Sequence, residues 1–239
     1  MKHILKDIKT AKANGTPLLA VLIDPDKFKL EDLELFVTKA HQTIITHFFV
    51  GGSTVEAHIT QKLVEALKQK TYLPIVLFPG DVTQISDQAD AILYLSLLSG
   101  RNTEYLIEKH VKSVPLLENS SLEVIPTGYL LIESGTETAV QRVTKTTPIS
   151  NELLVAQTAK AGEYLGMKLI YLEAGSGAKQ PVSTSIISLT KSKLSIPIIV
   201  GGGIRSKKQL EKAYKAGADL VVIGTAFEKD LDFFDEITH

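Results

Sequence analysis

Two glycine-rich turns near the end of the chain are the strongest sign of chemistry in this sequence. Gly201, Gly202 and Gly203 follow one apolar run, and Gly224 and Thr225 follow the next. Glycine lets backbone N–H groups approach an anion closely, and a helix that begins behind the turn adds partial positive charge. The spacing between the turns leaves room for one helix and one strand, so both can close on one phosphate. We favour this phosphate site over glycines that serve only tight turns.

A carboxylate lies beside a third glycine turn. Glu173 ends an apolar run and is followed by Ala174, Gly175, Ser176 and Gly177. A carboxylate accepts hydrogen bonds from hydroxyl groups and the turn adds backbone donors, so this combination suits a polyol phosphate. A simple ion pair between Glu173 and a lysine is the alternative. With an ordinary pKa of about 4.3, Glu173 is expected to be ionised at pH 7.

A second set of polar residues follows the first two apolar runs. Pro25 ends the first run and holds the preceding backbone extended, so Asp24 stays at the end of that run and does not enter a helix. Ser53 and Thr54 follow the second run, and one of them is expected to cap a helix. Mg²⁺ usually takes one or two carboxylates from a protein and completes its shell with waters and phosphate oxygens. The pattern therefore indicates a Mg²⁺-bridged phosphate, with Asp26 solvated or in a salt bridge.

The composition excludes several other classes of protein. The chain has 26 lysine and arginine residues and 27 acidic residues. Its net charge of −1 lacks the excess of basic residues that is typical of proteins that bind nucleic acid. Cysteine is absent, which removes disulfides, thiolate metal sites and a cysteine nucleophile. No serine-hydrolase, Walker or dinucleotide-binding pattern occurs. The histidines show no metal-ligand spacing; they are His3, His41, His47, His58, His110 and His239.

The elements that must position these residues are short apolar runs that alternate with longer amphipathic ones. Most of the apolar runs have no polar alternation, as is typical of parallel strands covered on both faces. The strand candidates are 18–23, 47–50, 74–78, 91–96, 128–132, 168–172, 198–201 and 220–223. The helix candidates are 30–41, 54–70, 102–110, 151–165, 183–191 and 207–216. Eight strands in 239 residues without a linker predict an α/β protein, a (β/α)₈ TIM barrel, as a single domain over residues 1–239.

Two segments depart from this repeat. The stretch between Phe78 and Ala91 is too short for a helix and two loops, so we expect the third helix to be missing or reduced to a turn. One side of the barrel would then be open to an apolar ligand; a short helix with tight loops is the alternative. Residues 133–148 are polar and rich in threonine, which indicates a surface loop or a mobile lid.

The start of the chain alternates charged and apolar residues and lacks the apolar stretch of a signal peptide. No apolar run in the sequence is long enough to span a bilayer. We therefore expect a cytoplasmic protein without a transmembrane segment, and leave open whether it visits the membrane surface.

Five motifs together resemble one enzyme family. They are IDPDK (23–27), FVGGST (49–54), YLEAGSGA (171–178), VGGGIRS (200–206) and VVIGTAFE (221–228). Their combination and order resemble the geranylgeranylglyceryl phosphate synthase family, which includes the bacterial heptaprenylglyceryl phosphate synthases. The resemblance covers nearly the whole chain. It implies a modified (β/α)₈ barrel in which the third helix is replaced, in agreement with the short segment after Phe78.

The resemblance also implies a function. The enzyme would transfer a prenyl group, expected to be geranylgeranyl, from its diphosphate to the 3-hydroxyl of sn-glycerol 1-phosphate, forming an ether lipid precursor. Asp24 and Ser53 would bind Mg²⁺, Asp24 and Glu173 would be catalytic, and the chain would form a homo-oligomer. The implied substrate-binding residues are Tyr171, Leu172, Glu173, Ala174, Gly175, Ser176, Gly177, Gly202, Gly203, Gly224 and Thr225. Tyr94 and Tyr105 are the candidates for the bulky aromatic that limits prenyl length in this family.

Elementary chemistry agrees with these roles. An allylic diphosphate ionises when the charge on its leaving group is neutralised, which Mg²⁺ held by Asp24 would do. The carbocation needs an apolar, water-poor channel, because water would otherwise compete for it. Glu173 would align the glycerol hydroxyl and accept its proton late in the reaction.

Three alternatives remain beside this interpretation. A close one is a synthase of the same family that uses heptaprenyl diphosphate. Another phosphate-binding barrel enzyme, such as a sugar-phosphate isomerase, would share the late glycine turns but has no need of both IDPDK and YLEAGSGA. A non-enzymatic phosphate-binding scaffold would have no reason to keep Asp24, Ser53 and Glu173 together.

Overall fold

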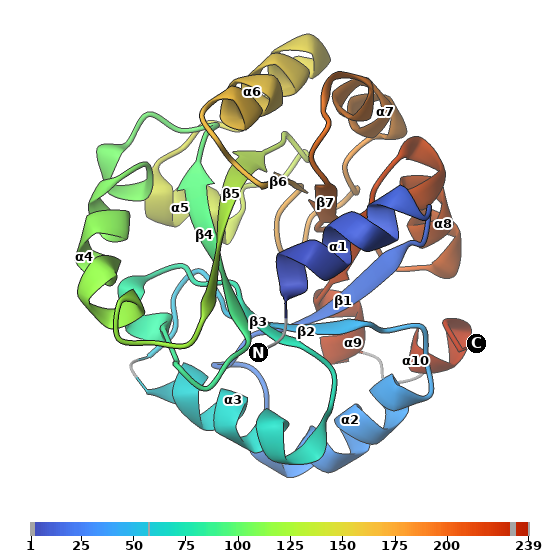
Figure 1. The fold of residues 1–239 in the computed structure, drawn as a ribbon. Helices are drawn as coiled ribbons and strands as arrows, with labels where there is room; N and C mark the ends of the chain where they lie inside the picture. Colours follow the sequence, from blue (N-terminus) through green and yellow to red (C-terminus); the bar gives the residue numbers. More distant parts are fainter. Residues whose placement is uncertain (1–2, 57, 230–232, 239) are drawn as a thin grey trace.

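Eight parallel strands form a closed barrel in chain order, with helices around its outside (Figure 1). The structure is a computed structural model that describes residues 3–56, 58–229 and 233–238, so His239 lies outside the described residues. Within these residues the expected (β/α)₈ barrel is confirmed. The strands are β1 Leu18–Ile23, β2 His47–Val50, β3 Ile75–Leu77, β4 Ala91–Leu97, β5 Glu123–Leu131, β6 Leu169–Glu173, β7 Ile198–Gly201 and β8 Leu220–Ile223.

The strands are apolar throughout because both of their faces are buried. In β1, Leu18 and Ala20 belong to the cluster inside the barrel. Leu19 and Val21, which alternate with them, pack in the outer cluster with Phe36 of a surrounding helix. This alternation fixes which residues of each strand can reach the mouth of the barrel.

The covering helices lie in five of the six predicted amphipathic runs, and three of them begin at capping side chains. They are α2 Leu33–His41, α3 Ile59–Lys70, α4 Glu108–Leu117, α6 Glu152–Tyr164, α7 Thr184–Lys193 and α8 Lys207–Ala216. The side chains of Asn151, Ser183 and Ser206 accept hydrogen bonds from the first turns of α6, α7 and α8.

Two helix starts differ from the prediction. The helix expected at 102–110 is wrong: Asn102 caps a 3₁₀ turn over Thr103–Tyr105, and the α-helix runs from Glu108 to Leu117. The cap expected at Ser53 or Thr54 is wrong, because α3 begins only at Ile59.

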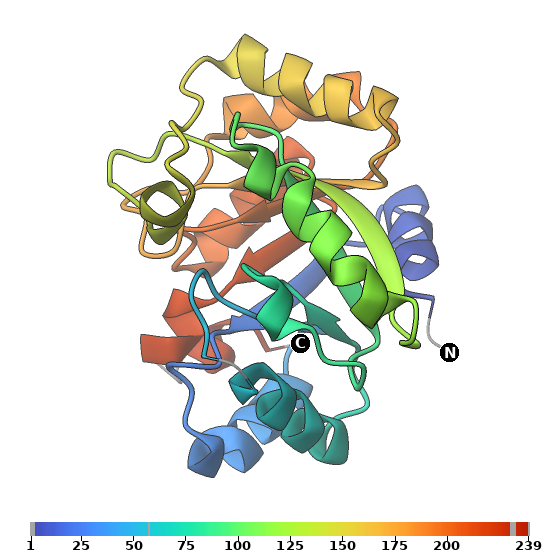
Figure 2. The ribbon, with the colours of Figure 1, turned by 90° about the vertical axis from the view of Figure 1, so that its left-hand side faces the viewer.

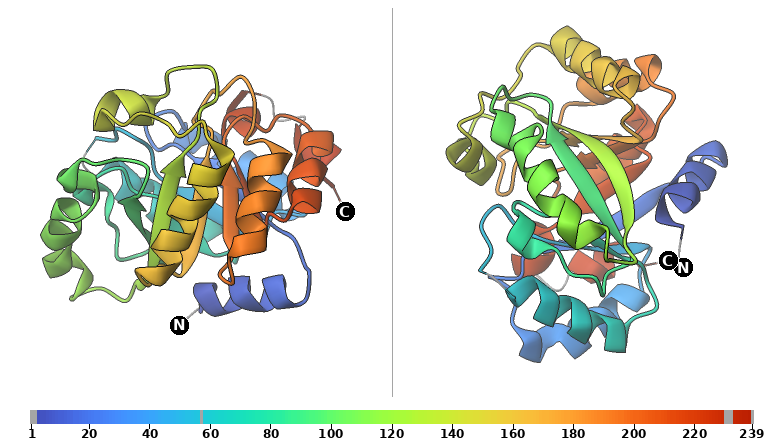
Figure 3. Two further views of the ribbon diagram at one scale, coloured as in Figure 1. Left: turned by 90° about the horizontal axis from the view of Figure 1, so that it is seen from above. Right: turned by 60° about the vertical axis from the view of Figure 1, so that its left-hand side comes forward.

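Several elements lie outside the predicted pattern. The helix α1 (Ile4–Ala13) closes the amino-terminal end of the barrel (Figure 3), where Ile4 and Ile8 join the inner cluster. The Glu123 carboxylate accepts the Ile4 N–H at 2.6 Å, which satisfies the start of this helix. The strand β5 begins at Glu123, five residues before the predicted start at 128. The prediction missed these residues because Glu123 and Pro126 interrupt the apolar run. Short helices also occur after β5 and β8: α5 Ala139–Thr144, α9 Thr225–Lys229 and α10 Phe233–Glu236.

The third strand unit has no α-helix. Within the described chain, residues 78–90 contain only a 3₁₀ turn, η2 (Val82–Gln84), so the expected loss of the third helix is confirmed. This segment lies between α3 and α4, and α4 runs diagonally across β4 and β5 (Figure 2). The barrel is therefore thinly covered between β3 and β4. Among the described helices, none combines the length and apolar character needed to cross a bilayer.

Candidate active site

One cavity at the carboxyl ends of the strands gathers most of the polar residues singled out in the sequence. Its volume is about 430 Å³. The predicted residues that line it are Asp24, Ser53, Tyr171, Glu173, Ser176, Gly177, Gly202, Gly203, Gly224 and Thr225. Leu172 and Ala174 do not line it, because their side chains pack between the barrel and the helices. Gly175 contributes instead through its backbone N–H, which Glu173 accepts.

The turn after β7 needs glycine on both conformational and steric grounds. Gly202 and Gly203 have φ values of 83° and 73°, in the left-handed region that other residues rarely adopt. A Cβ on Gly202 would lie 2.4 Å from Glu173 Oε1, and one on Gly203 would lie 2.8 Å from the carbonyl of Gln180. The turn after β7 is thus pressed against the turn after β6, which brings two sets of backbone amides to one place.

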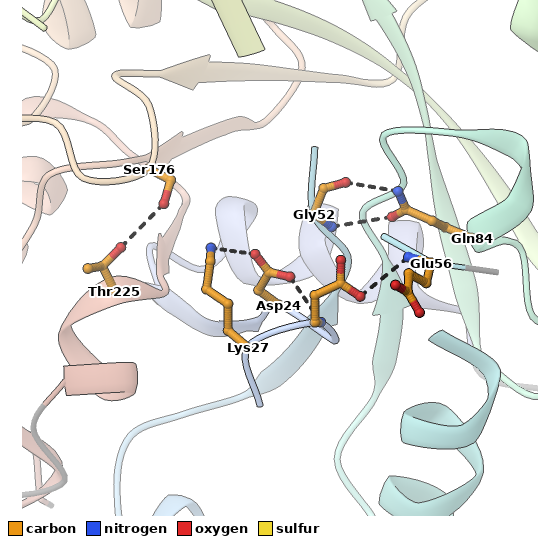
Figure 4. Close-up of polar contacts among 8 residues, drawn as sticks. Asp24, Lys27, Gly52, Glu56, Gln84, Ser176 and Thr225 are labelled. Atoms are coloured by element: carbon orange, nitrogen blue, oxygen red, sulfur yellow. Dashed lines mark hydrogen bonds and ion pairs between the residues drawn. The ribbon is translucent and has the colours of Figure 1, made fainter. Parts of the chain in front are cut away.

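Side chains fasten these turns to one another. Arg205 donates through Nη2 to the carbonyl oxygens of Ala178 at 2.6 Å and Gly177 at 3.3 Å. The Ser176 and Thr225 hydroxyls are 3.5 Å apart, so the turn after β6 also meets the end of β8 (Figure 4). The three turns form a polar wall of backbone and hydroxyl groups. Such a wall can bind a phosphate and adjacent hydroxyls.

Glu173 is a buried carboxyl at the centre of this wall. It is 5% exposed and accepts the Gly175 N–H at 2.6 Å. Burial raises the pKa of Glu173 to about 7, although the hydrogen bond from Gly175 opposes the shift. The expectation of an ordinary pKa and full ionisation at pH 7 is therefore wrong. The residue can bind or release a proton near neutral pH.

Asp24 and Ser53 lie across the cavity from this wall. Asp24 accepts the Lys27 ammonium at 2.5 Å and the Asp26 N–H at 3.3 Å (Figure 4). A Cβ on Gly52 would lie 2.9 Å from Asp24 Oδ1, so only glycine allows the turn after β2 to lie against this carboxylate. Asp26 also lines the cavity, and its Oδ1 accepts the N–H of Glu56 at 3.3 Å.

The donor set on this side fits a hard cation that substrate oxygens share. Asp24 supplies a carboxylate and Ser53 a hydroxyl, both oxygen ligands of the kind that Mg²⁺ takes. Across the described residues, no three His, Cys, Asp or Glu side chains converge into a protein-only metal centre. A cation here would thus complete its shell with water and phosphate oxygens.

A second, apolar cavity adjoins the polar one on the thin side of the barrel. It measures about 130 Å³ and extends between the 78–85 segment, β4 and α4. Gly52, Ser53, Phe78, Tyr129 and Val140 line both cavities, so the two are adjacent compartments. Tyr94 and Tyr105, the candidate length-limiting residues, both line the apolar cavity.

Three aromatic rings stand where the two cavities meet. Phe78 stacks on Tyr171 with ring centroids 5.1 Å apart, and Tyr129 lies 5.4 Å from Tyr171 and 5.9 Å from Phe78. Burial, and next the Glu173 carboxylate, raise the pKa of both tyrosines well above the ordinary range, so both hydroxyls stay protonated. Sequence reasoning missed Phe78 and Tyr129, because each reads as one more apolar strand residue.

The predicted loop over residues 133–148 contributes to the mouth through a short helix. A capping box between Thr138 and Gln141 starts α5. Ala139, Val140 and Arg142 of this helix line the polar cavity. The segment is therefore an ordered part of the cavity wall, and its role as a lid stays a prediction.

The fold and the site together define a TIM barrel whose mouth holds a polar cavity and an adjoining apolar one. The PcrB family profile matches residues 16–239, and the chain belongs to the PcrB family. A geranylgeranylglyceryl phosphate synthase from Flavobacterium johnsoniae is 59% identical over 97% of this chain and 96% of its own length. One from Thermococcus kodakarensis is 41% identical over 87% of this chain and 83% of its own length.

Solved structures show the same likeness. The geranylgeranylglyceryl phosphate synthase of Thermoplasma acidophilum, solved in complex with its substrate sn-glycerol-1-phosphate, has a TM-score of 0.92 and 33% identity, covering 99% of this chain and 96% of that one. The wild-type Thermoplasma volcanium enzyme has a TM-score of 0.91 and 36% identity, over 99% and 95%. The family resemblance read from the five motifs is confirmed, and the chain is an enzyme of the prenyltransferase class.

Proposed function

We propose that this enzyme joins a prenyl group from its diphosphate to the 3-hydroxyl of sn-glycerol 1-phosphate. The observation that carries the proposal is the pair of adjoining cavities, one polar and one apolar. A polar acceptor and an apolar donor need this combination, and a sugar-phosphate isomerase has no use for the apolar one. The bound sn-glycerol-1-phosphate in the related Thermoplasma structure supports the acceptor.

The acceptor would lie against the turns after β6, β7 and β8. The backbone of Gly202, Gly203 and Gly224 and the hydroxyl of Thr225 would hold its phosphate. Glu173 would bind the glycerol hydroxyls, and the turn from Ala174 to Gly177 would add backbone contacts. In its ionised form the Glu173 carboxylate accepts the proton of the reacting hydroxyl as the ether bond forms.

The donor diphosphate would lie on the opposite side, near Asp24 and Ser53. Mg²⁺, bound by these two residues and by diphosphate oxygens, would supply Lewis acidity toward the departing diphosphate. The rings of Phe78, Tyr129 and Tyr171 pack together where the two cavities meet, so they would lie near the allylic carbon and stabilise its positive charge. They also keep water away from that carbon.

The prenyl tail would enter the apolar cavity toward Tyr94 and Tyr105. We expect geranylgeranyl diphosphate as donor, with heptaprenyl diphosphate as the alternative. Burial of twenty carbons at about 0.8 kcal/mol per CH₂ gives an upper bound of about 16 kcal/mol, which exceeds any realistic net affinity after ordering costs. Part of the tail would therefore remain outside the cavity.

The test is analysis of the lipid product. The purified enzyme is incubated with sn-glycerol 1-phosphate, Mg²⁺ and prenyl diphosphates of several lengths, and the products are identified by mass spectrometry. We expect a geranylgeranyl ether, and none from Asp24→Asn, whose fold should persist because Asp24 lies at the rim. Asp32→Asn, at an exposed position, serves as the matched control. A product from heptaprenyl diphosphate alone would establish the alternative donor, and no product from any donor would refute the proposal.

Two further expectations concern the enzyme in its surroundings. We propose a homo-oligomer in the cytoplasm that meets its lipid substrate at the membrane surface. Light scattering of the purified protein tests the first part, since a monomer would contradict it. Sedimentation with phospholipid vesicles tests the second.

A further inference from the structure

Gln84 is a buried amide in the 3₁₀ turn that stands where the third helix would be. It is 1% exposed and makes hydrogen bonds through both ends of its side-chain amide. Nε2 donates to the Gly52 carbonyl at 2.9 Å, and Oε1 accepts the N–H groups of Gly52 and Gly80, each at 3.3 Å. Figure 4 shows this paired contact between Gln84 and Gly52. The Gln84 side chain thus bonds both the N–H and the carbonyl of Gly52 in the turn after β2.

The two segments joined by Gln84 are in direct contact along their backbones. A Cβ on Gly80 would lie 2.5 Å from the Gly52 carbonyl oxygen and 2.9 Å from that of Ser53. A Cβ on Gly51 would lie 1.9 Å from the carbonyl oxygen of Phe78. No side chain at these positions separates the segments. They are joined by the Gln84 amide and, at the end of the strand ladder, by the hydrogen bond from the Phe78 N–H to the Val50 carbonyl at 2.8 Å.

These segments serve the two cavities. The turn after β2 carries Ser53 and, through Gly52, lies against Asp24 on the polar side. The other segment contributes Phe78, Gly80 and Val82 to the apolar cavity. In a regular barrel, a helix following β3 would pack against these two segments and support them. That helix is absent from the described residues 78–90, and the Gln84 side chain makes contacts in its place.

We propose that Gln84 is a positioning residue that sets the Ser53 turn against Asp24 and, from the same amide, holds the wall of the apolar cavity. It thereby selects a donor that has both a diphosphate head and an apolar tail. This selectivity rests on the proposed function, whereas the positioning does not.

Two substitutions disrupt the hydrogen bonds of Gln84 in different ways. Gln84→Met keeps the length of the side chain and removes all three hydrogen bonds. Gln84→Glu keeps the acceptors for Gly52 and Gly80 but, when ionised, sets a negative oxygen against the Gly52 carbonyl. Gln61→Met is the matched control, because Gln61 is an exposed glutamine of α3 whose amide bonds Glu65 on the same helix.

The experiment combines hydrogen exchange with binding and kinetics. We expect faster amide exchange in residues 49–56 of both Gln84 variants without substrate. Calorimetric titration with geranylgeranyl diphosphate and Mg²⁺, without acceptor, should show about tenfold weaker binding, as the loss of net hydrogen-bond energy implies. The KM for sn-glycerol 1-phosphate should stay within about twofold of the wild-type value, since the acceptor wall does not touch Gln84.

The outcomes distinguish this proposal from the proposed function. Unchanged exchange and donor binding in Gln84→Met would overturn it. A parallel loss in donor binding, acceptor KM and melting temperature would assign Gln84 a general structural role and overturn it as well. If the wild-type enzyme itself neither binds nor uses a prenyl diphosphate, the proposed function and the donor selectivity fail, and exchange in residues 49–56 still decides the positioning.

Discussion

At the scale of single residues, Glu173 is the group whose chemistry the fold changes most. A solvated glutamate is ionised at neutral pH, whereas burial behind Gly202 and beside Tyr171 raises the pKa of this one to about 7. The free enzyme therefore contains both forms near neutrality. Only the ionised form accepts the proton of the glycerol hydroxyl.

We expect activity to titrate with Glu173. The kcat/KM for sn-glycerol 1-phosphate should rise as the pH passes through about 7 and level off above it, because the carboxylate form becomes complete. In Glu173→Gln this rise should vanish and the rate should fall roughly 10²- to 10⁴-fold. Steady-state rates across this pH range measure both effects. Glu65→Gln, at an exposed site on α3, should match the wild type; a flat wild-type profile would contradict a catalytic base at Glu173.

The same burial should lower stability at high pH. The folded-state pKa of about 7 lies above the ordinary value of 4.5, so the unfolded chain loses this proton first as the pH rises. Between these two values the free energy of unfolding falls, by on the order of 3 kcal/mol in total. We expect Glu173→Gln to be more stable than the wild type above pH 7, measured by urea unfolding. An equal difference at acid and alkaline pH would show that its charge is not the cause.

Among the elements, the turns that end the strands line the polar cavity, and the missing helix after β3 leaves room for the apolar one. The turn after β7 combines a left-handed backbone with contact against the turn after β6, so its sequence tolerates little change. The segment after β3 is too short to form a helix, and Lys109 of α4 holds it by an ion pair with Asp81 at 2.7 Å.

Gly203→Ala tests the first of these elements. At φ 73° and 2.8 Å from the Gln180 carbonyl, the added methyl should displace the turn and raise the KM for sn-glycerol 1-phosphate about tenfold or more, with the donor KM little changed. Gly15→Ala controls for backbone strain alone, because Gly15 has φ 66° and open space around it. Steady-state kinetics with each substrate varied in turn give the comparison. Equal effects of the two variants on acceptor KM would argue against a phosphate site at this turn.

At the scale of the whole molecule, the barrel places the acceptor wall and the donor side on opposite sides of one mouth. In the proposed complex, the phosphate end of the acceptor would bind at the β7 and β8 turns while its hydroxyls would meet Glu173, because all of these groups line one cavity. These contacts are directional, so they should distinguish the mirror forms of glycerol phosphate. In the proposed complex, the apolar cavity would fix the side from which the donor approaches.

We therefore expect strong stereochemical selection. sn-Glycerol 1-phosphate should be a far better acceptor than its 3-phosphate enantiomer, because exchanging two substituents at the central carbon moves a hydroxyl away from Glu173. Initial rates with each pure enantiomer at equal concentration measure the preference. Equal rates would mean that the acceptor is not held by this wall. Gly203→Ala should reduce the preference, whereas Gly15→Ala should leave it unchanged.

The barrel and the polar residues of its rim could be predicted from the amino-acid sequence. Continuous apolar runs can be buried only on both faces, so Leu18–Ile23 and Leu220–Ile223 had to be parallel strands, and polar residues placed directly after such runs had to lie at the mouth. The length of the segment after Phe78 excluded a full helix. These features are local, because periodicity, capping and chain length act over a few residues.

The other features of the fold and the site could not be predicted, because they depend on contacts between residues far apart in the chain. Burial by neighbouring turns changed the pKa of Glu173, the packing of Ile4 and Ile8 placed α1 under the barrel, and the approach of Phe78, Tyr129 and Tyr171 made the aromatic border between the cavities. Gln84 reads as an ordinary surface glutamine. Its side chain is buried and hydrogen-bonded to the backbone of Gly52, because the segment without a helix packs against the turn after β2.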